Sequence, residues 1–191
     1  SVSAFLLNRS SDLSLTAIDR TNHILYTTED LTTLGAVTGN VTLTIDGNTT
    51  LTNGKVMSVA KSVYGGGEES GVDGNTEVTV TGGTIGTENE GGAEYGNIYG
   101  GGKGKADDVA AGIVKGSTTV SISGSPTILH NVYGGGAYGS VGTFSYDATT
   151  GFPTGWTITD NKGKCTVSIT GGTIGSTGKD NGMVFGSSRG L

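Results

Sequence analysis

Two short motifs alternate along this chain, and their recurrence limits the folds it can adopt more than any other feature. The first alternates branched and hydroxyl residues before a glycine corner, as in Val-Thr-Val-Thr-Gly-Gly-Thr-Ile-Gly at residues 78–86. The second reads Val-Tyr-Gly-Gly-Gly or a close variant. Copies of the first motif begin at Val41, Val78, Val120 and Val167, and copies of the second begin at Val63, Ile98, Val132 and, in a worn form, Val184.

Inside the first motif the residue pattern has a period of two, which is the period of a β-strand. Val120 and Ile122 alternate with Ser121 and Ser123, so we expect the branched side chains to face a core and the hydroxyls to face outwards. Runs this short do not form a stable sheet alone. Copies stacked in parallel would pair with the copies above and below and form one core along the stacking axis.

The chain is therefore predicted to be all-β: a parallel β-solenoid of about four coils, in its common form a right-handed β-helix. The equivalent residues Tyr64, Tyr99 and Tyr133 are 35 and 34 residues apart, and Phe185 follows 52 residues later. A β-sandwich of hairpins also has short, regularly spaced strands. The recurrence of whole motifs and the scarcity of Asn-Gly and Asp-Gly turn pairs disfavour that alternative.

The repeats span residues 41–191, and the longer last interval predicts an insertion at about residues 144–162, which contains Pro153 and Trp156. Residues 1–40 lack the repeat and are expected to form an N-terminal cap or an irregular first coil, because solenoid ends need covering. The chain stops just after a repeat motif. We therefore expect it to be a piece of a longer array, with self-association through the solenoid ends as a further hypothesis.

Composition narrows the function classes. Glycine supplies 37 of the 191 residues, which disfavours long helices because each interior glycine costs about 1 kcal/mol. A net charge of −6 with only 11 Lys and Arg disfavours nucleic acids and anionic membranes as partners. The chain has no run of 18 apolar residues, so no membrane span is expected. The single Cys165 excludes an internal disulfide and a cysteine-based zinc site, and no cofactor is expected.

An aromatic residue occupies the same position in every repeat, which makes this column the main binding candidate. In a solenoid the equivalent rings would stack about 4.8 Å apart. If the preceding branched residues face the core, the rings form an outward ladder that could stack on sugar rings. The alternative is a purely structural ladder, since aromatic neighbours on paired strands contribute about 0.2–1 kcal/mol each. The column consists of Tyr64, Tyr99, Tyr133 and Phe185.

The insertion offers a second binding candidate. It contains Trp156 together with Tyr146 and Phe152, and long loops in compact folds are often functional. The insertion could form a binding lobe or simply cover the flank of the solenoid. His130, which lies just before a strand, is expected at the rim of the fold.

Hydroxyl and carboxylate groups give weaker signals. Paired hydroxyls in each repeat would form two rows on one face, a pattern that some ice-binding solenoids use, although such residues also simply suit exposed strands. Loop carboxylates around the glycine corners could bind Ca²⁺ or support catalysis, or they could be solvated charge. The hydroxyls are Thr42, Thr44, Thr79, Thr81, Ser121, Ser123, Ser168 and Thr170, and the carboxylates are Glu68, Glu69, Asp73, Glu88, Glu90, Glu94, Asp107 and Asp108.

The doublet of Val-x-Ile-x-Gly-Gly-Thr-Ile-Gly and Val-Tyr-Gly-Gly-Gly over residues 41–191 resembles the glycine-rich repeats of large surface proteins of gut anaerobic bacteria, regarded as adhesins with a pectin-lyase-like β-helix. This resemblance implies an extracellular, cell-surface location and a non-enzymatic structural or adhesive role. Its implied partners are host or dietary glycans, or a host surface protein. The alternative is a polysaccharide lyase or glycoside hydrolase of the β-helix type that uses the acidic loops.

Overall fold

The computed structural model describes residues 15–19, 24–27, 34–47, 56–88, 95–146, 153–156 and 162–190. Within these ranges the chain forms strands, turns and bends and no helix. The chain is divided into two compact units, Ser1–Leu34 and Gly35–Leu191. The division falls a few residues before the predicted boundary at residue 41, because Val37 already pairs with Val72 of the next coil.

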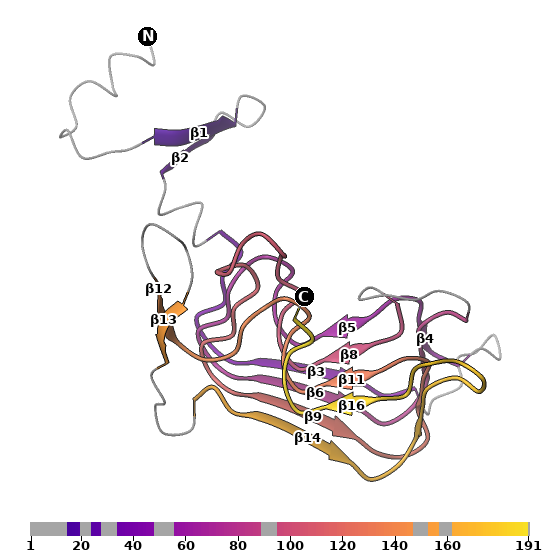
Figure 1. Ribbon diagram of the computed structural model, residues 1–191. Helices are drawn as coiled ribbons and strands as arrows, with labels where there is room; N and C mark the ends of the chain where they lie inside the picture. Colours follow the sequence, from indigo (N-terminus) through magenta and orange to yellow (C-terminus); the bar gives the residue numbers. More distant parts are fainter. Residues whose placement is uncertain are drawn as a thin grey trace. The chain divides into compact units, whose positions relative to one another are not determined.

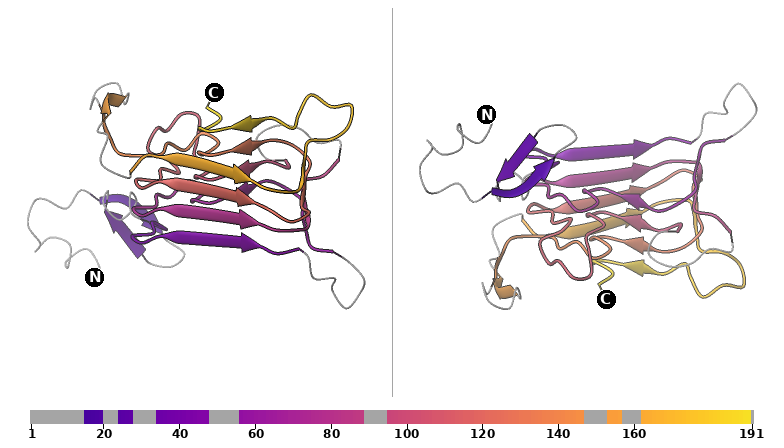
Figure 2. Two further views of the ribbon diagram at one scale, coloured as in Figure 1. Left: turned by 90° about the horizontal axis from the view of Figure 1, so that it is seen from below. Right: turned by 90° about the horizontal axis from the view of Figure 1, so that it is seen from above.

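The larger unit is a stack of four coils, and each coil contributes one strand to each of three parallel sheets (Figures 1 and 2). The first sheet consists of β3 (Val41–Ile45), β6 (Thr76–Val80), β9 (Thr118–Ile122) and β14 (Cys165–Ile169). The second consists of β4 (Ser58–Val59), β7 (Thr84–Ile85), β10 (Thr127–Ile128) and β15 (Thr173–Ile174). The third consists of β5 (Val63–Tyr64), β8 (Ile98–Tyr99), β11 (Val132–Tyr133) and β16 (Val184–Phe185).

In all three sheets the order of the strands follows the order of the coils along the chain. Single bridges between Val37, Val72, Val114 and Val141 continue the stacking at a fourth side of each coil. Parallel pairing with residues about one repeat away is the arrangement that the recurring motifs predict, whereas hairpins would pair neighbouring strands antiparallel. The solenoid-like prediction is confirmed for this unit, and the β-sandwich alternative is wrong for it.

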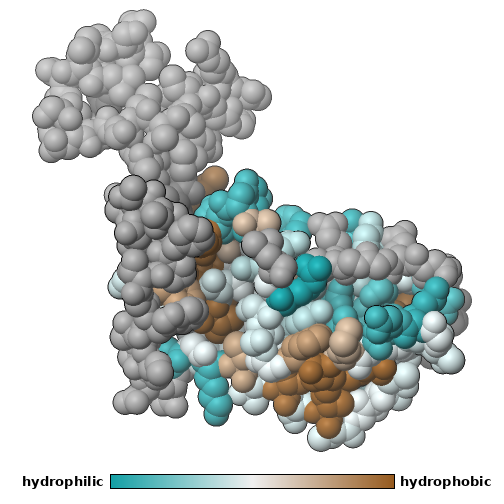
Figure 3. Space-filling model, in the orientation of Figure 1, coloured by the Kyte–Doolittle hydropathy of each residue, from teal (hydrophilic) through white to brown (hydrophobic). Residues whose placement is uncertain are grey.

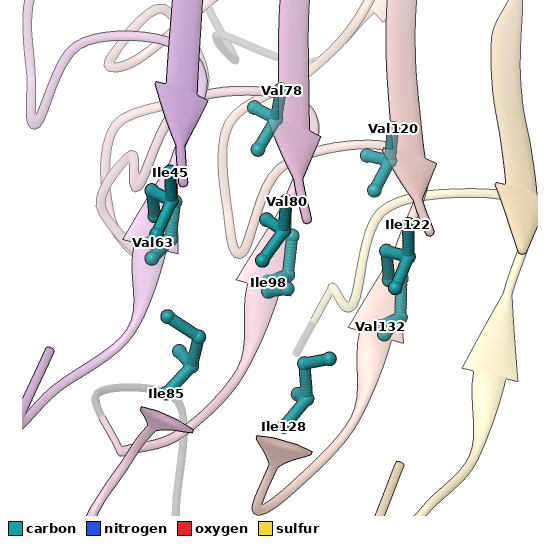
Figure 4. Packing of buried hydrophobic residues seen from close by; sticks show 10 residues of the cluster. All are labelled: Ile45, Val63, Val78, Val80, Ile85, Ile98, Val120, Ile122, Ile128 and Val132. Carbon is teal, nitrogen blue, oxygen red and sulfur yellow. The ribbon is translucent and has the colours of Figure 1, made fainter. Parts of the chain in front are cut away.

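The core runs along the inside of the coils, where alternate side chains of each strand meet (Figure 4). In β9 the side chains of Val120 and Ile122 are buried, whereas Ser121 between them is half-buried on the other face. The pairing register places Val78 beside Val120 and Val80 beside Ile122. Branched residues suit such positions because they fill a pleated surface with few rotamers to lose.

Side-chain oxygens join successive coils at two corners. At the first, the Asn40 Oδ1 accepts a hydrogen bond from the backbone N–H of Asn75, 2.8 Å away, and the Asn75 Oδ1 accepts one from Ser117. At the second, the Asn97 Oδ1 accepts from the N–H of Asn131 at 3.1 Å. These bonds satisfy backbone donors that turn away from the sheet ladders.

The glycine corners that follow the aromatic residues allow the coils to approach closely. A Cβ atom on Gly65 would overlap the carbonyl oxygen of Gly100, and one on Gly100 would overlap that of Gly134. The spacing of the coils therefore requires glycine at this position in the first three copies.

Two antiparallel hairpins lie outside the stacked sheets. In the smaller unit, β1 (Leu15–Asp19) pairs with β2 (Ile24–Thr27); the function of this unit as a cap stays a prediction. Within the predicted insertion, β12 (Phe144–Tyr146) pairs with β13 (Pro153–Trp156). The ends of this insertion meet at Gly142 and Gly163, whose backbones are in close contact.

Candidate functional site

The predicted aromatic column exists as one continuous stack of four rings on the side of the third sheet that faces away from the branched core. Successive ring centroids are 4.9 Å apart at all three steps. The planes of Tyr64 and Tyr99 lie 3° from parallel, and those of Tyr133 and Phe185 lie 8° from parallel. The spacing follows from the parallel register, which places equivalent residues on adjacent strands.

The column is mostly a second core and not an open face. Tyr99 is fully buried and Tyr133 is 6% exposed, and both pack with Ala137, Tyr64 and Tyr138. Each of these two rings has another ring on both of its faces, so neither can stack on a sugar. The prediction of an exposed glycan-stacking platform is therefore wrong for Tyr99 and Tyr133. Tyr64 is half-buried, and Phe185, at the end of the stack, is 38% exposed.

The hydroxyl group of Tyr99 is buried and has no hydrogen-bond partner among the described residues. Burial disfavours the phenolate and raises the pKa of Tyr99 well above its usual value, and the neighbouring hydroxyls of Tyr64 and Tyr133 act in the same direction. Arg189 has a smaller, opposing effect on this pKa. The Tyr133 hydroxyl, in contrast, accepts a hydrogen bond from the Asn131 Nδ2 at 3.4 Å.

Arg189 and Tyr138 lie together beside the aromatic column. The guanidinium lies 5.8 Å from the centre of the Tyr138 ring and donates to its hydroxyl at 3.4 Å. This hydrogen bond raises the pKa of Arg189. The backbone N–H of Arg189 also donates to the carbonyl of Gly136 at 2.9 Å, so the residue is anchored to the preceding coil.

The hydroxyl rows do not align as predicted in the first coil. The register pairs Thr44 with Thr79 and Thr42 with Glu77, so the first coil is offset by two residues from the expected rows. Thr79, Ser121 and Ser168 continue one row as expected. Beside it, the Thr81 hydroxyl donates to the Asp46 carboxylate at 3.1 Å. Glu77 in the row on one side and Asp46 in the row on the other side interrupt the regular lattice of hydroxyls.

Several of the predicted loop carboxylates form ion pairs. The Lys103 ammonium lies 2.9 Å from the Glu68 carboxylate of the preceding coil, and Lys115 lies 2.6 Å from Asp73. Lys105 lies 3.6 Å from Asp107. Glu90 and Glu94 lie outside the described residues. Within the described ranges, no group of three acidic, histidine or cysteine side chains is placed to hold a metal ion.

Trp156 lies in β13, where its backbone pairs with Phe144. Its side chain and that of Tyr146 lie outside the described part, as does Phe152. The binding role predicted for Trp156 stays a prediction.

A cleft of about 800 Å³ opens between the second and third sheets, where the coils turn from one sheet to the other. Only three residues, 129–131, connect β10 to β11, whereas residues 86–97 and 175–183 make the same connection in the coils on either side. The short corner thus lies in a hollow beside the longer loop of residues 175–183, and Glu88 and Asn97 of the second coil also line this hollow. Its floor includes Leu129, His130 and Asn131.

Most of the residues that line this cleft are polar. Uncharged polar residues of the lining come from the second, third and fourth coils. They include Asn97, Thr127, Asn131, Thr173, Ser176 and Asn181. The charged residues are Glu88, Lys179, Asp180 and Arg189. The sequence predicts His130 at a rim and Glu88 in an acidic loop, but it does not predict that the two residues line one cleft. The unequal number of residues between the two motifs in successive repeats was the signal that could have indicated this cleft.

The last coil carries an exposed apolar patch. Its large apolar side chains Ile169, Met183, Val184 and Phe185 are 38–47% exposed. Figure 3 shows apolar atoms gathered low on the front of the stack, where β16 runs in Figure 1.

Comparison of the chain with protein-family models, curated proteins and solved structures finds no match. The described residues include no helix with the length and hydrophobicity of a membrane span.

Proposed function

We propose that this chain is a non-enzymatic structural and adhesive segment of a large bacterial cell-surface protein, located outside the cell. In this proposal the stack is a right-handed β-helix, residues 1–40 act as its N-terminal cap, and the coils form a stiff support that presents ligand-contacting groups.

The observation that carries the proposal is that three kinds of ladder run through the same coils. Parallel backbone pairs, stacked aromatic rings and side-chain oxygens at the corners all link equivalent residues of successive coils. Repeat architectures of this kind derive their stability from contacts between neighbouring units. Such a stack suits a role as a spacer or support, and Tyr64, Tyr99 and Tyr133 are part of its construction.

Glycan contact remains the proposed adhesive role, without the buried Tyr99 and Tyr133. Phe185 has an exposed fraction of 38%, and together with Trp156 it stays a candidate for contact with sugar rings. The polar cleft offers a further surface for glycans. A host surface protein is the other proposed partner.

Self-association through the solenoid ends also stays a proposal. The exposed apolar patch of the last coil supports it. In the last coil, however, Lys164 and Met183 occupy the corner positions at which earlier coils carry Asn or Ser, and their backbone N–H groups donate the last bonds of both corner ladders. Neither of these side chains has an oxygen. If the first coil of a second copy stacked in register on this last coil, the corner N–H groups of that first coil would therefore find no side-chain acceptor.

The enzyme alternative is favoured by one observation. The carboxylates of Glu88 and Asp180 line the same cleft as His130, and glycosidases require a pair of carboxyl groups. A glycoside hydrolase that acts in this cleft is therefore the second candidate function.

Two measurements test the proposal. Limited proteolysis of intact cells of the source organism is expected to release peptides of this chain, because the proposal places it at the cell surface. Incubation of the purified chain with mucin and plant polysaccharides is expected to produce neither new reducing ends nor unsaturated sugars. Release of peptides only after lysis would contradict the location, and turnover of a polysaccharide would favour the enzyme.

A further inference from the structure

We propose that the cleft above the short corner of the third coil binds a neutral oligosaccharide. This inference rests on the proposed adhesive function and specifies its site and ligand class. The volume of the cleft, about 800 Å³, lies within the range of about 300–1,000 Å³ that is typical of small-molecule sites.

One wall of the cleft is fixed to its floor by hydrogen bonds. The Asn131 Oδ1, at the floor, accepts a bond from the backbone N–H of Met183 at 2.9 Å. The Ser176 hydroxyl donates to the carbonyl of Leu129 at 2.9 Å, and the Ser176 N–H donates to the Asn181 Oδ1 at 2.7 Å. The loop of residues 175–183 is thereby tied to the corner and to itself. A site that is already formed loses less conformational entropy when a ligand binds.

The chemistry of the lining favours a ligand with many hydroxyl groups. The Thr127 and Thr173 side chains stand at the same position on the paired strands β10 and β15 and both line the cleft. Hydroxyl groups can donate and accept hydrogen bonds, as the hydroxyls of a sugar can. His130 and Lys179 also line the cleft, and both side chains can donate hydrogen bonds to the hydroxyls of a sugar.

The charges and apolar groups of the lining exclude other ligand classes. Lys179 and Arg189 balance Glu88 and Asp180, so the cleft has no excess of positive charge that would select a phosphate or an acidic sugar. The large apolar side chains of the lining are those of Leu129, which is 8% exposed, and Tyr133, which is 6% exposed. These two side chains therefore offer little surface to a lipid or an aromatic ligand.

The test is titration of the ¹⁵N-labelled full chain with tetrasaccharides of glucose, xylose, mannose and N-acetylglucosamine, followed by NMR. Tetragalacturonate serves as the acidic comparison. At sugar concentrations of about 10 mM, a ligand with a Kd near 1 mM would be mostly bound. At least one neutral tetrasaccharide is expected to shift the amide signals of residues 129–131 and 175–181 and to leave those of β3 unchanged.

Variants locate the binding. Lys179→Ala and His130→Ala are each expected to weaken the binding of that tetrasaccharide about tenfold. The matched control is Lys164→Ala, an exposed lysine outside the cleft lining, which should bind as the unchanged chain does. Replacing residues 175–183 with the three-residue connection Leu-His-Asn of the third coil removes one wall and should abolish binding, provided that the amide signals of β9 show an intact stack.

Three results would overturn the inference: no neutral sugar shifts the cleft amides, binding is equal in the Lys179→Ala and Lys164→Ala chains, or only tetragalacturonate binds. None of these would disprove the proposed non-enzymatic surface function. Cleavage of a bound tetrasaccharide would support the proposed binding site but would contradict the non-enzymatic function.

Discussion

Tyr99 and Tyr133 lie 34 residues apart in the sequence, yet their rings stack with centroids 4.9 Å apart and planes 11° from parallel. The backbone pairing of β8 with β11 places the two residues opposite each other. The aromatic position therefore links coils directly, and its loss should affect the stack more than the loss of a single surface contact.

Tyr99 provides a test of this linkage with an internal control. Tyr99→Ala is expected to lower the free energy of unfolding by about 3–5 kcal/mol, the range for removing a large buried aromatic side chain. Tyr99→Phe keeps the ring and removes a buried hydroxyl that has no partner among the described residues, so it should leave this free energy unchanged or raise it by about 1 kcal/mol. Urea denaturation of both variants measures the difference. A loss of more than about 1 kcal/mol in Tyr99→Phe would mean that the hydroxyl is bonded.

The raised pKa of Tyr99 predicts a loss of stability at alkaline pH. The unfolded chain releases this proton near pH 10, whereas the folded chain retains it to higher pH because the buried ring disfavours the phenolate. The free energy of unfolding is therefore not lowered by this group below about pH 10, and above that pH it falls by up to about 1.4 kcal/mol per pH unit. Urea denaturation at pH 9, 10 and 11 measures the slope, and Tyr99→Phe should show a smaller one. Equal slopes in the two chains would contradict this assignment.

The sequence allowed the stacked strands to be predicted because their pattern is local and repeated. The alternation in Val120-Ser121-Ile122 predicts one buried face, and recurrence of the motif predicts parallel pairing. The register of the first coil was harder to predict. Val41-Thr42-Leu43 matches the later copies equally well in two positions two residues apart, since both keep the branched residues inside.

The burial of the aromatic column could not be predicted from the motif. The rings do face away from the branched core, as expected, but Ala137 and Tyr138 from the following loop pack against them. A strand pattern gives the side of the sheet on which a residue lies and does not tell whether a loop covers that side. The cleft was missed for a related reason, because it depends on how residues from three coils meet in space.

The Asn97 side chain tests the contribution of the corner ladder. Asn97 is 2% exposed, and its Oδ1 accepts the Asn131 N–H while its Nδ2 donates to the carbonyl of Tyr95. Asn97→Ala leaves both backbone groups without these partners and is expected to cost about 1–3 kcal/mol.

Asn40→Ala is the matched control for this ladder. Asn40 also accepts a backbone N–H from the next coil, but it is exposed, so water can replace the side chain. The expected cost is below about 1 kcal/mol. Thermal and urea unfolding of both variants give the comparison, and equal losses would mean that burial does not set the strength of the ladder.

The column of glycines offers the sharpest test of coil spacing. A Cβ atom on Gly100 would overlap the carbonyl oxygen of Gly134, a backbone atom that cannot move without separating the coils. Gly186 occupies the equivalent position in the last coil, where a Cβ would meet nothing within 4 Å. Gly100→Ala is expected to cost about 1–3 kcal/mol or more, and Gly186→Ala to change the stability by less than about 0.5 kcal/mol. Urea denaturation of the two variants measures this difference. Because the backbone conformation at Gly100 is not left-handed, a loss can be assigned to steric overlap alone. If Gly100→Ala were as stable as Gly186→Ala, the coils would have to be further apart than the structure places them.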